Sequence, residues 1–324
     1  MNNTYERQLT EFQYKQDLLV VNAVLMAPTV FGNTLILYCV CKYPGLRTKM
    51  NGLIVNLAVA DLLVGLVVFP YNMAAILIPS INKGKITCLL KHSFYTTFIG
   101  ASILNMFIIS LERYSAVMSP LKYHINYSTK RLKRYCIAGW STSVTLGILP
   151  LMGWNTWSLD QPCFSKCVLH EGYISLALSI YIPAIIITIL QYILVIRKVF
   201  KYVMHKKTII EGTVRPSIND KNILKTKLMI IVFGIFAICW APYASNTILQ
   251  TYFLTKNAEL GKLETYFGFL GVFNCAVNWI IYGVLNKRMK RAFKLALCCK
   301  YLNRLSLRNR NNSQMSTNVF TLQK

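Results

Sequence analysis

Seven long apolar stretches dominate the chain, and each exceeds or approaches the length that a helix needs to cross a membrane. The hydrocarbon core of a bilayer is about 30 Å thick, which takes about 20 helical residues to span. Helices of soluble proteins seldom stay apolar on every face for so long. The sequence therefore predicts an all-α membrane protein, a bundle of seven transmembrane helices. The stretches comprise residues 18–41, 50–78, 94–118, 135–152, 173–196, 228–254 and 265–285.

Only three Asp, Glu, Lys or Arg residues lie well inside these stretches: Asp61 in the second, and Glu112 and Arg113 near the end of the third. A charge at the centre of a bilayer costs about 2.5–3.5 kcal/mol on insertion scales, and such residues are usually functional. Arg113 keeps its charge at any depth, so the adjacent Glu112 is its expected partner. These three residues therefore predict functional polar sites inside the bundle.

The basic residues are distributed very unevenly between the two sides of the predicted membrane. The net charge is +25, and 27 of the 36 Lys and Arg residues fall in the segments after the first, third, fifth and seventh stretches. The positive-inside rule places these segments in the cytoplasm. We therefore expect a multi-pass plasma-membrane protein with its N-terminus outside and its C-terminus in the cytoplasm. A nucleic-acid partner is not expected, because it would need a contiguous soluble basic surface.

The predicted organisation has four parts. Residues 1–17 form an extracellular tail, and Asn2 in the sequon Asn2-Asn3-Thr4 is a candidate glycosylation site. Residues 18–285 form the seven-helix domain, residues 286–299 a short amphipathic cytoplasmic eighth helix, and residues 300–324 a disordered cytoplasmic tail.

The eighth helix is predicted to lie on the inner leaflet of the membrane. Met289, Phe293 and Leu297 recur at every fourth position among basic residues, so one face is apolar and the rest is cationic. Such a helix binds membrane lipid through both properties. Cys298 and Cys299 follow it and are candidate palmitoylation sites, the alternative being two inert thiols near the bilayer.

Three of the ten cysteines fall on the outer side, where disulfides persist. Cys88 precedes the third stretch, whereas Cys163 and Cys167 lie in the loop before the fifth. One disulfide from Cys88 to this loop would hold the loop across the outer mouth of the bundle. The sequence leaves the partner open; we favour Cys167, which is closer to the fifth stretch, and a Cys163–Cys167 bridge would close a short, strained loop.

Short motifs along the chain resemble those of the rhodopsin-like (class A) family of G-protein-coupled receptors. The resemblance covers nearly the whole chain, and each motif falls in the stretch where the family has it. Residues 286–299 also resemble the short eighth helix of opsins. The motifs are Gly32-Asn33, Leu57-Ala58-Val59-Ala60-Asp61, Glu112-Arg113-Tyr114, Trp140, Pro183, Cys239-Trp240-Ala241-Pro242 and Asn278-Trp279-Ile280-Ile281-Tyr282.

This resemblance implies a receptor that binds an extracellular small molecule within the bundle and activates heterotrimeric G proteins. Arrestin and a receptor kinase are further implied partners. The family also implies a sodium pocket, in which Ser102, Asn274 and Asn278 face Asp61 and offer oxygen ligands. The alternative is a structural hydrogen-bond network without sodium.

The resemblance further implies an activation switch. Family members use the arginine corresponding to Arg113 to contact the G protein once the sixth helix swings outward. Pro183, Ile103 and Phe236 match the family's packing switch beneath the ligand, and Trp240 lies one turn from Phe236. The switch is thereby assigned to Glu112, Arg113, Tyr114, Ile103, Pro183, Phe236, Trp240 and Tyr282.

Three residues depart from the family pattern. Trp279 replaces a proline in the seventh helix, so that a kink there should be weaker or shifted. Gln191 stands where most members have a tyrosine, and the adjacent Tyr192 is expected to face elsewhere. Asn222 replaces a glutamate that locks the arginine in some members, which predicts higher basal signalling.

The ligand class stays open at this point. Val272 stands where opsins carry the retinal-binding lysine, so no retinal cofactor is expected. Tyr95 stands where amine receptors have an aspartate, which leaves an amine without an evident counter-ion. Residues 150–155 look like a segment of adenosine and lysophospholipid receptors, but Leu169 and Thr247 replace residues that read the purine, so the ligand is adenosine-, lipid- or amine-like. By family position the pocket comprises Tyr95, Thr96, Ile99, Ser175, Ser179, Trp240, Tyr243, Asn246, Thr247 and Phe269.

Two other classes fit the sequence less well. A channel or transporter would need a continuous polar path, which Asp61 and Arg113 do not make. An enzyme would need a catalytic set, and the sequence has no paired carboxylates or metal-spaced histidines. An enzyme is therefore not expected.

Overall fold

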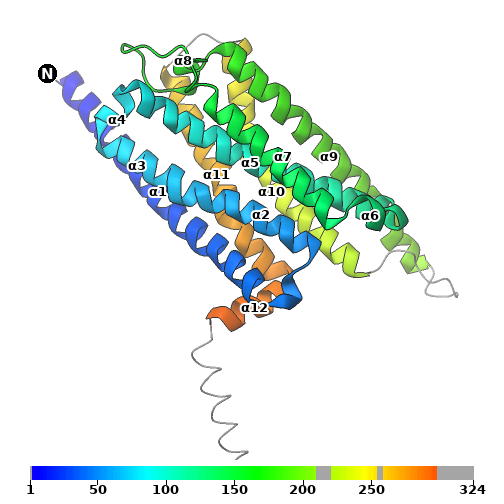
Figure 1. Ribbon diagram of the computed structural model, residues 1–324. Coiled ribbons are helices and arrows are strands. Elements are labelled where there is room, and N and C mark those ends of the chain that lie inside the picture. The colour runs from blue at the N-terminus through cyan, green and yellow to red at the C-terminus, as the bar shows by residue number, and fades with distance from the viewer. Residues whose placement is uncertain (1, 209–219, 254–257, 298–324) are drawn as a thin grey trace, which may run out of the picture.

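The structure is a computed structural model that describes residues 2–208, 220–253 and 258–297, with side chains described for 11–123, 127–201, 228, 230–253 and 263–297. Cys298, Cys299 and the predicted tail 300–324 lie outside the described residues, as do the side chains of Asn2 and Asn222. Long helices run side by side through the bundle (Figure 1). They are α1 (Asn2–Lys42), α2 (Lys49–Leu63), α3 (Phe69–Leu77), α5 (Lys85–Met118), α7 (Thr129–Ile148), α9 (Glu171–Thr208), α10 (Asp220–Tyr252) and α11 (Ala258–Leu285).

Shorter elements join the long ones. A π-helical turn, η2 (Val64–Val68), makes α2 and α3 one continuous span, and α12 (Lys287–Leu297) follows α11 as the predicted eighth helix. The start of α1, α4 and α8 lie at one end of the bundle, called here the N-terminal end; α12 and α6 lie at the other, the α12 end (Figure 1). The remaining short elements are η1 (Pro44–Leu46), α4 (Pro79–Lys83), α6 (Pro120–Asn126) and α8 (Ser165–Val168).

Six of the spans are long and apolar enough to cross a membrane by length and composition. The seventh, α7, is less apolar because basic residues fill its first turns, but it packs tightly against α5. A side chain added at Gly147 would come within 2.0 Å of Thr97 Oγ1, so this glycine permits the close approach. Trp140 Nε1 also donates to Asn56 Oδ1 on α2, at 3.1 Å. The prediction of an all-α seven-helix bundle is confirmed.

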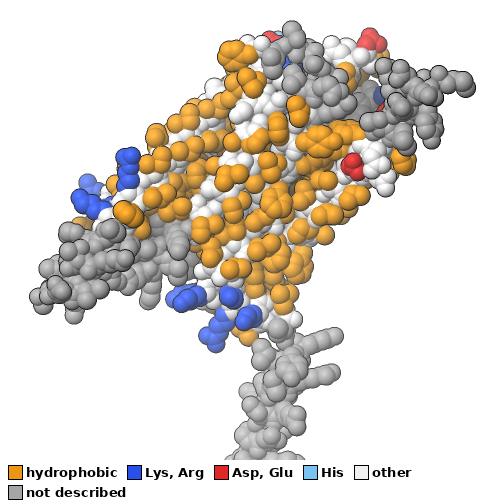
Figure 2. Space-filling model, turned by 180° about the vertical axis from the view of Figure 1, so that it is seen from behind, with side chains coloured by type: hydrophobic (Ala, Val, Ile, Leu, Met, Phe, Trp, Pro, Cys, Tyr) orange, Lys and Arg blue, Asp and Glu red, His pale blue; other side chains and the backbone are white. Residues whose placement is uncertain are grey.

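The surface agrees with a membrane environment. Figure 2 shows a broad band of apolar side chains over the long helices, with Lys and Arg gathered near the α12 end. Helix α1 begins at Asn2, so the segment predicted as a tail continues the first helix.

The disulfide joins Cys88 of α5 to Cys163, with Cα atoms 5.9 Å apart, and the prediction of Cys167 is wrong. The loop doubles back on itself: Asn155 pairs with Leu169, and Thr156 N donates to Val168 O at 2.9 Å. Cys167 lies beside this fixed point, whereas Cys163 lies in the part of the loop that extends to α5. The distance along the chain between a cysteine and the fifth helix therefore does not identify the disulfide partner of Cys88.

A tryptophan of α11 fits against a glycine of α1. Built on Gly32, a Cβ atom would lie 1.8 Å from Trp279 Cδ1, and Phe31 packs edge-on to the same indole with ring centroids 5.6 Å apart. Next to this contact, Asn33 Nδ2 donates to the carbonyl of Cys275 at 3.1 Å. Together these contacts fix α1 against α11.

Gly32→Ala should therefore lower the thermal stability and the surface expression of the protein, because the added methyl overlaps the indole ring. Gly52→Ala is the matched control, since Gly52 lies in α2 and a Cβ added there would meet nothing within 4 Å. Trp279→Ala should relieve this clash. The stability lost by the double variant should therefore be smaller than the sum of the stabilities lost by the two single variants. Unchanged melting of Gly32→Ala in detergent would contradict the contact.

Candidate functional site

Asp61 lies in α2 just before the π-helical turn and is fully buried. Ser102 Oγ of α5 donates to Asp61 Oδ1 at 2.7 Å, and Asn278 Nδ2 of α11 donates to Asp61 Oδ2 at 2.8 Å. Both polar atoms of Asn274 and Oδ1 of Asn278 are buried without a hydrogen-bond partner among the described atoms. Asn278, which contacts the carboxylate, thus leaves an unsatisfied buried oxygen, an arrangement that a bound cation or water completes.

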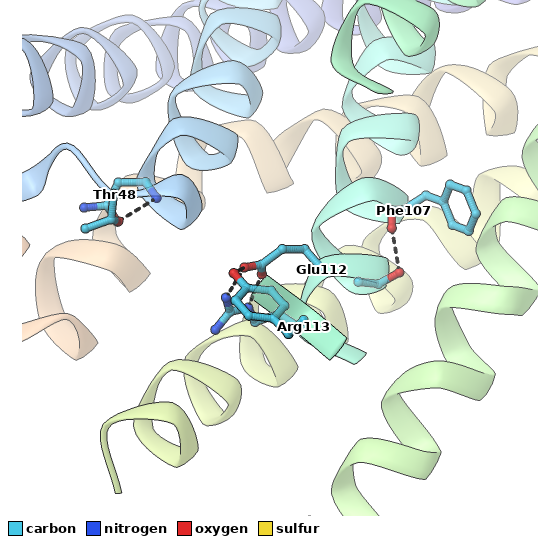
Figure 3. A network of polar contacts seen from close by, with 7 residues as sticks. Thr48, Phe107, Glu112 and Arg113 are labelled. Carbon is cyan, nitrogen blue, oxygen red and sulfur yellow. Dashed lines mark hydrogen bonds and ion pairs between the residues drawn. The ribbon is translucent and has the colours of Figure 1, made fainter. Parts of the chain in front are cut away.

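Glu112 and Arg113 form a buried ion pair near the α12 end of α5 (Figure 3). Arg113 donates to both carboxylate oxygens of Glu112, and the hydroxyl of Tyr123 on α6 donates to Glu112 as well. Burial, together with the charge of Glu112, raises the pKa of Tyr123, so this hydroxyl stays protonated as a donor. Tyr114 is half-buried and is not part of this network among the described contacts.

Helix α6 is fastened to its neighbours by two lysines. Lys49 of α2 donates to the carbonyl of Tyr127 at 2.9 Å and lies 5.7 Å from the ring centroid of Tyr123. Lys198 of α9 donates to the carbonyl of Met118, just before α6, at 3.0 Å. The donor that reaches Glu112 is thus held in place by α2 and α9.

A column of aromatic rings runs along α10 inside the bundle. The stacked pair Tyr192–Phe233 has centroids 4.7 Å apart, and the column continues through Phe236 to Trp240 with spacings of 6.1 and 6.4 Å. Tyr243 then meets Trp240 edge-on at 5.7 Å. Ile103 packs in the same core as Phe236, whereas Pro183 lies in α9, and Tyr282 is buried in α11.

Tyr192 and Gln191 face different neighbours, as the sequence predicts. Tyr192 is buried and stacked on Phe233. Gln191 instead lies at the α5 edge, where its Oε1 accepts from Ser110 Oγ at 2.7 Å. Helix α9 therefore contacts α10 through Tyr192 and α5 through Gln191.

A cavity of about 1660 Å³ opens at the N-terminal end. Side chains of α1, α3, α5, α9, α10 and α11 line it, together with the loop that carries the disulfide. Trp240 at the top of the aromatic column also lines this cavity, so the cavity and the column share a residue. Seven residues of the predicted pocket line it: Tyr95, Thr96, Ile99, Trp240, Tyr243, Thr247 and Phe269.

The other three predicted pocket residues lie outside the cavity. Ser179 is exposed and donates to the carbonyl of Leu176, and Ser175 accepts from the hydroxyl of Tyr252 at 3.1 Å. Asn246 is buried in α10 but does not line the cavity. Helix α9 presents Tyr181 and Ile185 to the cavity instead of the two serines.

Sequence reasoning missed the charged residues that line the cavity, which are Glu11, Lys15, Asp17, Lys83, Lys91, Asp160 and Glu264. Glu264 in α11 accepts a hydrogen bond from Ser165 Oγ, and Tyr243 also hydrogen-bonds its carboxylate. Lys91 in α5 lies one turn before Tyr95, and the charges of Lys91 and Glu264 act on each other. The expectation that the pocket has no carboxylate is therefore wrong. The predicted spans begin at residues 94 and 265, which assigns both residues to loops.

Comparison with known proteins agrees with this architecture. Residues 32–282 match the family described as 7 transmembrane receptor (rhodopsin family). The human histamine H2 receptor is 33% identical over 317 residues, which covers 93% of this chain and 86% of that receptor. The octopamine receptor beta-2R of Chilo suppressalis is 29% identical, covering 88% of this chain and 78% of its own. The 5-hydroxytryptamine receptor 4 of Cavia porcellus is 27% identical, covering 87% and 79%.

The seven-helix fold, the buried Glu112–Arg113 pair and these relatives agree with one another. The chain is a multi-pass membrane receptor that belongs to the rhodopsin-like (class A) family of G-protein-coupled receptors.

Proposed function

We propose that this receptor binds an extracellular small molecule that carries a cationic amine, and that it then activates a heterotrimeric G protein at its α12 end. The observation that carries the ligand class is the Glu264 carboxylate in the wall of the cavity. It supplies the counter-ion that α5 lacks, where Tyr95 stands. The relatives are named for histamine, octopamine and 5-hydroxytryptamine, which are all amines.

The aromatic lining supports the same ligand class. Tyr95, Tyr243 and Phe269 line the cavity together with Glu264. Aromatic faces attract cations, and the attraction grows when the cation leaves water. A carboxylate beside such rings is therefore suited to an organic ammonium group.

Two features support the orientation. The disulfide lies at the N-terminal end, and disulfides persist outside the cytoplasm. Lys and Arg are concentrated in the segments of the other side, as the positive-inside rule requires of the cytoplasmic face. The cavity then opens to the outside, and Arg113 lies near the cytoplasm.

The aromatic column connects the two ends. A ligand that moves Trp240 acts through Phe236 and Phe233 on Tyr192, whose buried hydroxyl has no hydrogen-bond partner among the described atoms. Separation of Arg113 from Glu112 would expose the guanidinium to the G protein. After activation, phosphorylation by a receptor kinase and binding of arrestin complete the proposed cycle.

The first prediction concerns Glu264. In cells with a G-protein-dissociation readout, at least one of histamine, octopamine and 5-hydroxytryptamine should activate the receptor. Glu264→Gln should raise the half-effective concentration about 10- to 100-fold, because a hydrogen bond to a charged group contributes about 1.5–3 kcal/mol. Glu171→Gln, an exposed acid at the start of α9, should have no effect. An equal response of Glu264→Gln and the wild type would refute the counter-ion.

A second prediction concerns sodium at Asp61. The carboxylate, the unsatisfied amide oxygens of Asn274 and Asn278 and the hydroxyl of Ser102 fit an oxygen-coordinated cation. The ion would neutralise Asp61 and hold α2, α5 and α11 in the inactive arrangement. We expect sodium chloride, compared with an organic-cation salt of equal ionic strength, to lower basal activity in the wild type. Asp61→Asn should abolish that difference, whereas a wild type insensitive to sodium would favour the plain hydrogen-bond network.

A third prediction concerns the lock on Arg113. Tyr123→Phe removes one donor from Glu112 and should raise basal G-protein activation several-fold, because the ion pair is less well held. Arg113→Ala should abolish activation while surface expression stays largely intact. Tyr135→Phe, at an exposed tyrosine of α7, is the matched control and should behave as the wild type. Normal coupling by Arg113→Ala would show that G-protein contact lies elsewhere.

A further inference from the structure

Lys91 and Glu264 are opposite charges presented to one cavity from two different helices. Lys91 shares a face of α5 with Tyr95 and Ile99, since residues four apart lie one above the other on a helix. Glu264 is on the first turns of α11. Both side chains are only partly exposed, although they line an open cavity. Each therefore offers a charge to whatever fills the space between α5 and α11.

One short loop segment holds both charges in position. Cys163 is bonded to Cys88, which lies one turn before Lys91 on α5. Two residues later, Ser165 donates its hydroxyl hydrogen to the Glu264 carboxylate. His92, next to Lys91, also lies 3.8 Å from Cys163 Sγ through its Nε2. The loop thus connects the cationic wall of the cavity directly to the anionic wall.

The interaction between Lys91 and Glu264 favours one kind of ligand over another. Glu11, Lys15, Asp17, Lys83 and Asp160 also line the cavity, but Glu264 is the residue whose charge acts on Lys91. A simple monoamine at Glu264 would neutralise that carboxylate and weaken the interaction of partly buried Lys91 with it, which is unfavourable. A ligand with a second, anionic group restores the balance at Lys91. The cavity, at about 1660 Å³, is larger than most small-molecule pockets and has room for a ligand that reaches both walls.

We propose that the cavity is a two-charge site for a zwitterionic ligand, an amine that also carries a carboxylate or a similar anionic group. Glu264 receives the ammonium group and Lys91 receives the anion. The rings of Tyr95 and Tyr243 line the same cavity and contact the body of the ligand. This inference rests on the proposed function, because it keeps Glu264 as the counter-ion and adds the requirement for an anion.

Matched ligand pairs test the inference. Histamine and histidine, tyramine and tyrosine, and 5-hydroxytryptamine and 5-hydroxytryptophan differ only by one carboxylate. In the G-protein-dissociation assay, the carboxylated member of at least one pair should be at least tenfold more potent at the wild type. Lys91→Gln should remove this preference, and Lys91→Arg should keep much of it. Lys85→Gln, at an exposed lysine on the same helix that does not line the cavity, should leave it unchanged.

The outcomes separate the two proposals, with surface expression of every variant measured by antibody labelling. If simple amines act through Glu264 and carboxylation abolishes or does not improve their potency, the two-charge site is refuted and the amine receptor stands. If Lys91→Gln makes simple amines more potent and carboxylated ligands stay inactive, Lys91 is a competitor of the ligand and the inference is also refuted. If no member of any pair activates the receptor, the proposed function and the inference fall together.

Discussion

Contact between glycines and aromatic rings of neighbouring helices is the interaction on which the rest of this bundle depends. Lipid tails are as apolar as the helices, so helices in a membrane associate through close packing and polar contacts rather than through the hydrophobic effect. Gly32 receives Trp279, Gly271 receives Trp240, and Gly100 receives Tyr181, each pair joining two different helices. Gly100, Tyr181 and Trp240 also line the cavity, so the packing contacts and the cavity wall share residues.

Buried polar groups complete this packing and divide the interior into regions. Asp61 joins α2, α5 and α11 at mid-depth, while Glu112, Arg113 and Tyr123 join α5 to α6 near the α12 end. The aromatic column along α10 lies between the cavity and the second of these regions. Under the proposed function, a shift of these rings is what would carry the effect of a ligand from the cavity toward Arg113.

The fold could be predicted from the sequence because long apolar runs with few buried charges are compatible with few structures other than a bundle of membrane-spanning helices. The helix ends could not be predicted, because charged residues on the outer turn of a helix look like loop residues. For this reason Lys91 and Glu264 were assigned to loops. The face that α9 turns to the cavity was also missed, because counting from Pro183 assumes that the helix keeps the family's orientation. Ser175 and Ser179 therefore lie outside the cavity, and Tyr181 and Ile185 line it. The disulfide partner depended on how the loop folds back at Asn155 and Leu169, which no local pattern encodes.

The hydrogen bonds of the Cys275 carbonyl affect which residues position 279 can hold. In an α-helix this carbonyl accepts from the amide of residue 279, and here Asn33 donates to it as well. A proline at position 279 would remove the helical donor but leave the carbonyl satisfied by Asn33. The proline ring would still press on this carbonyl and bend the helix, so Asn33 offsets the lost hydrogen bond but not the change of shape. The indole leaves no room for a Cβ atom at position 32, so in this receptor Trp279 makes glycine there a requirement of packing and not only of the family motif.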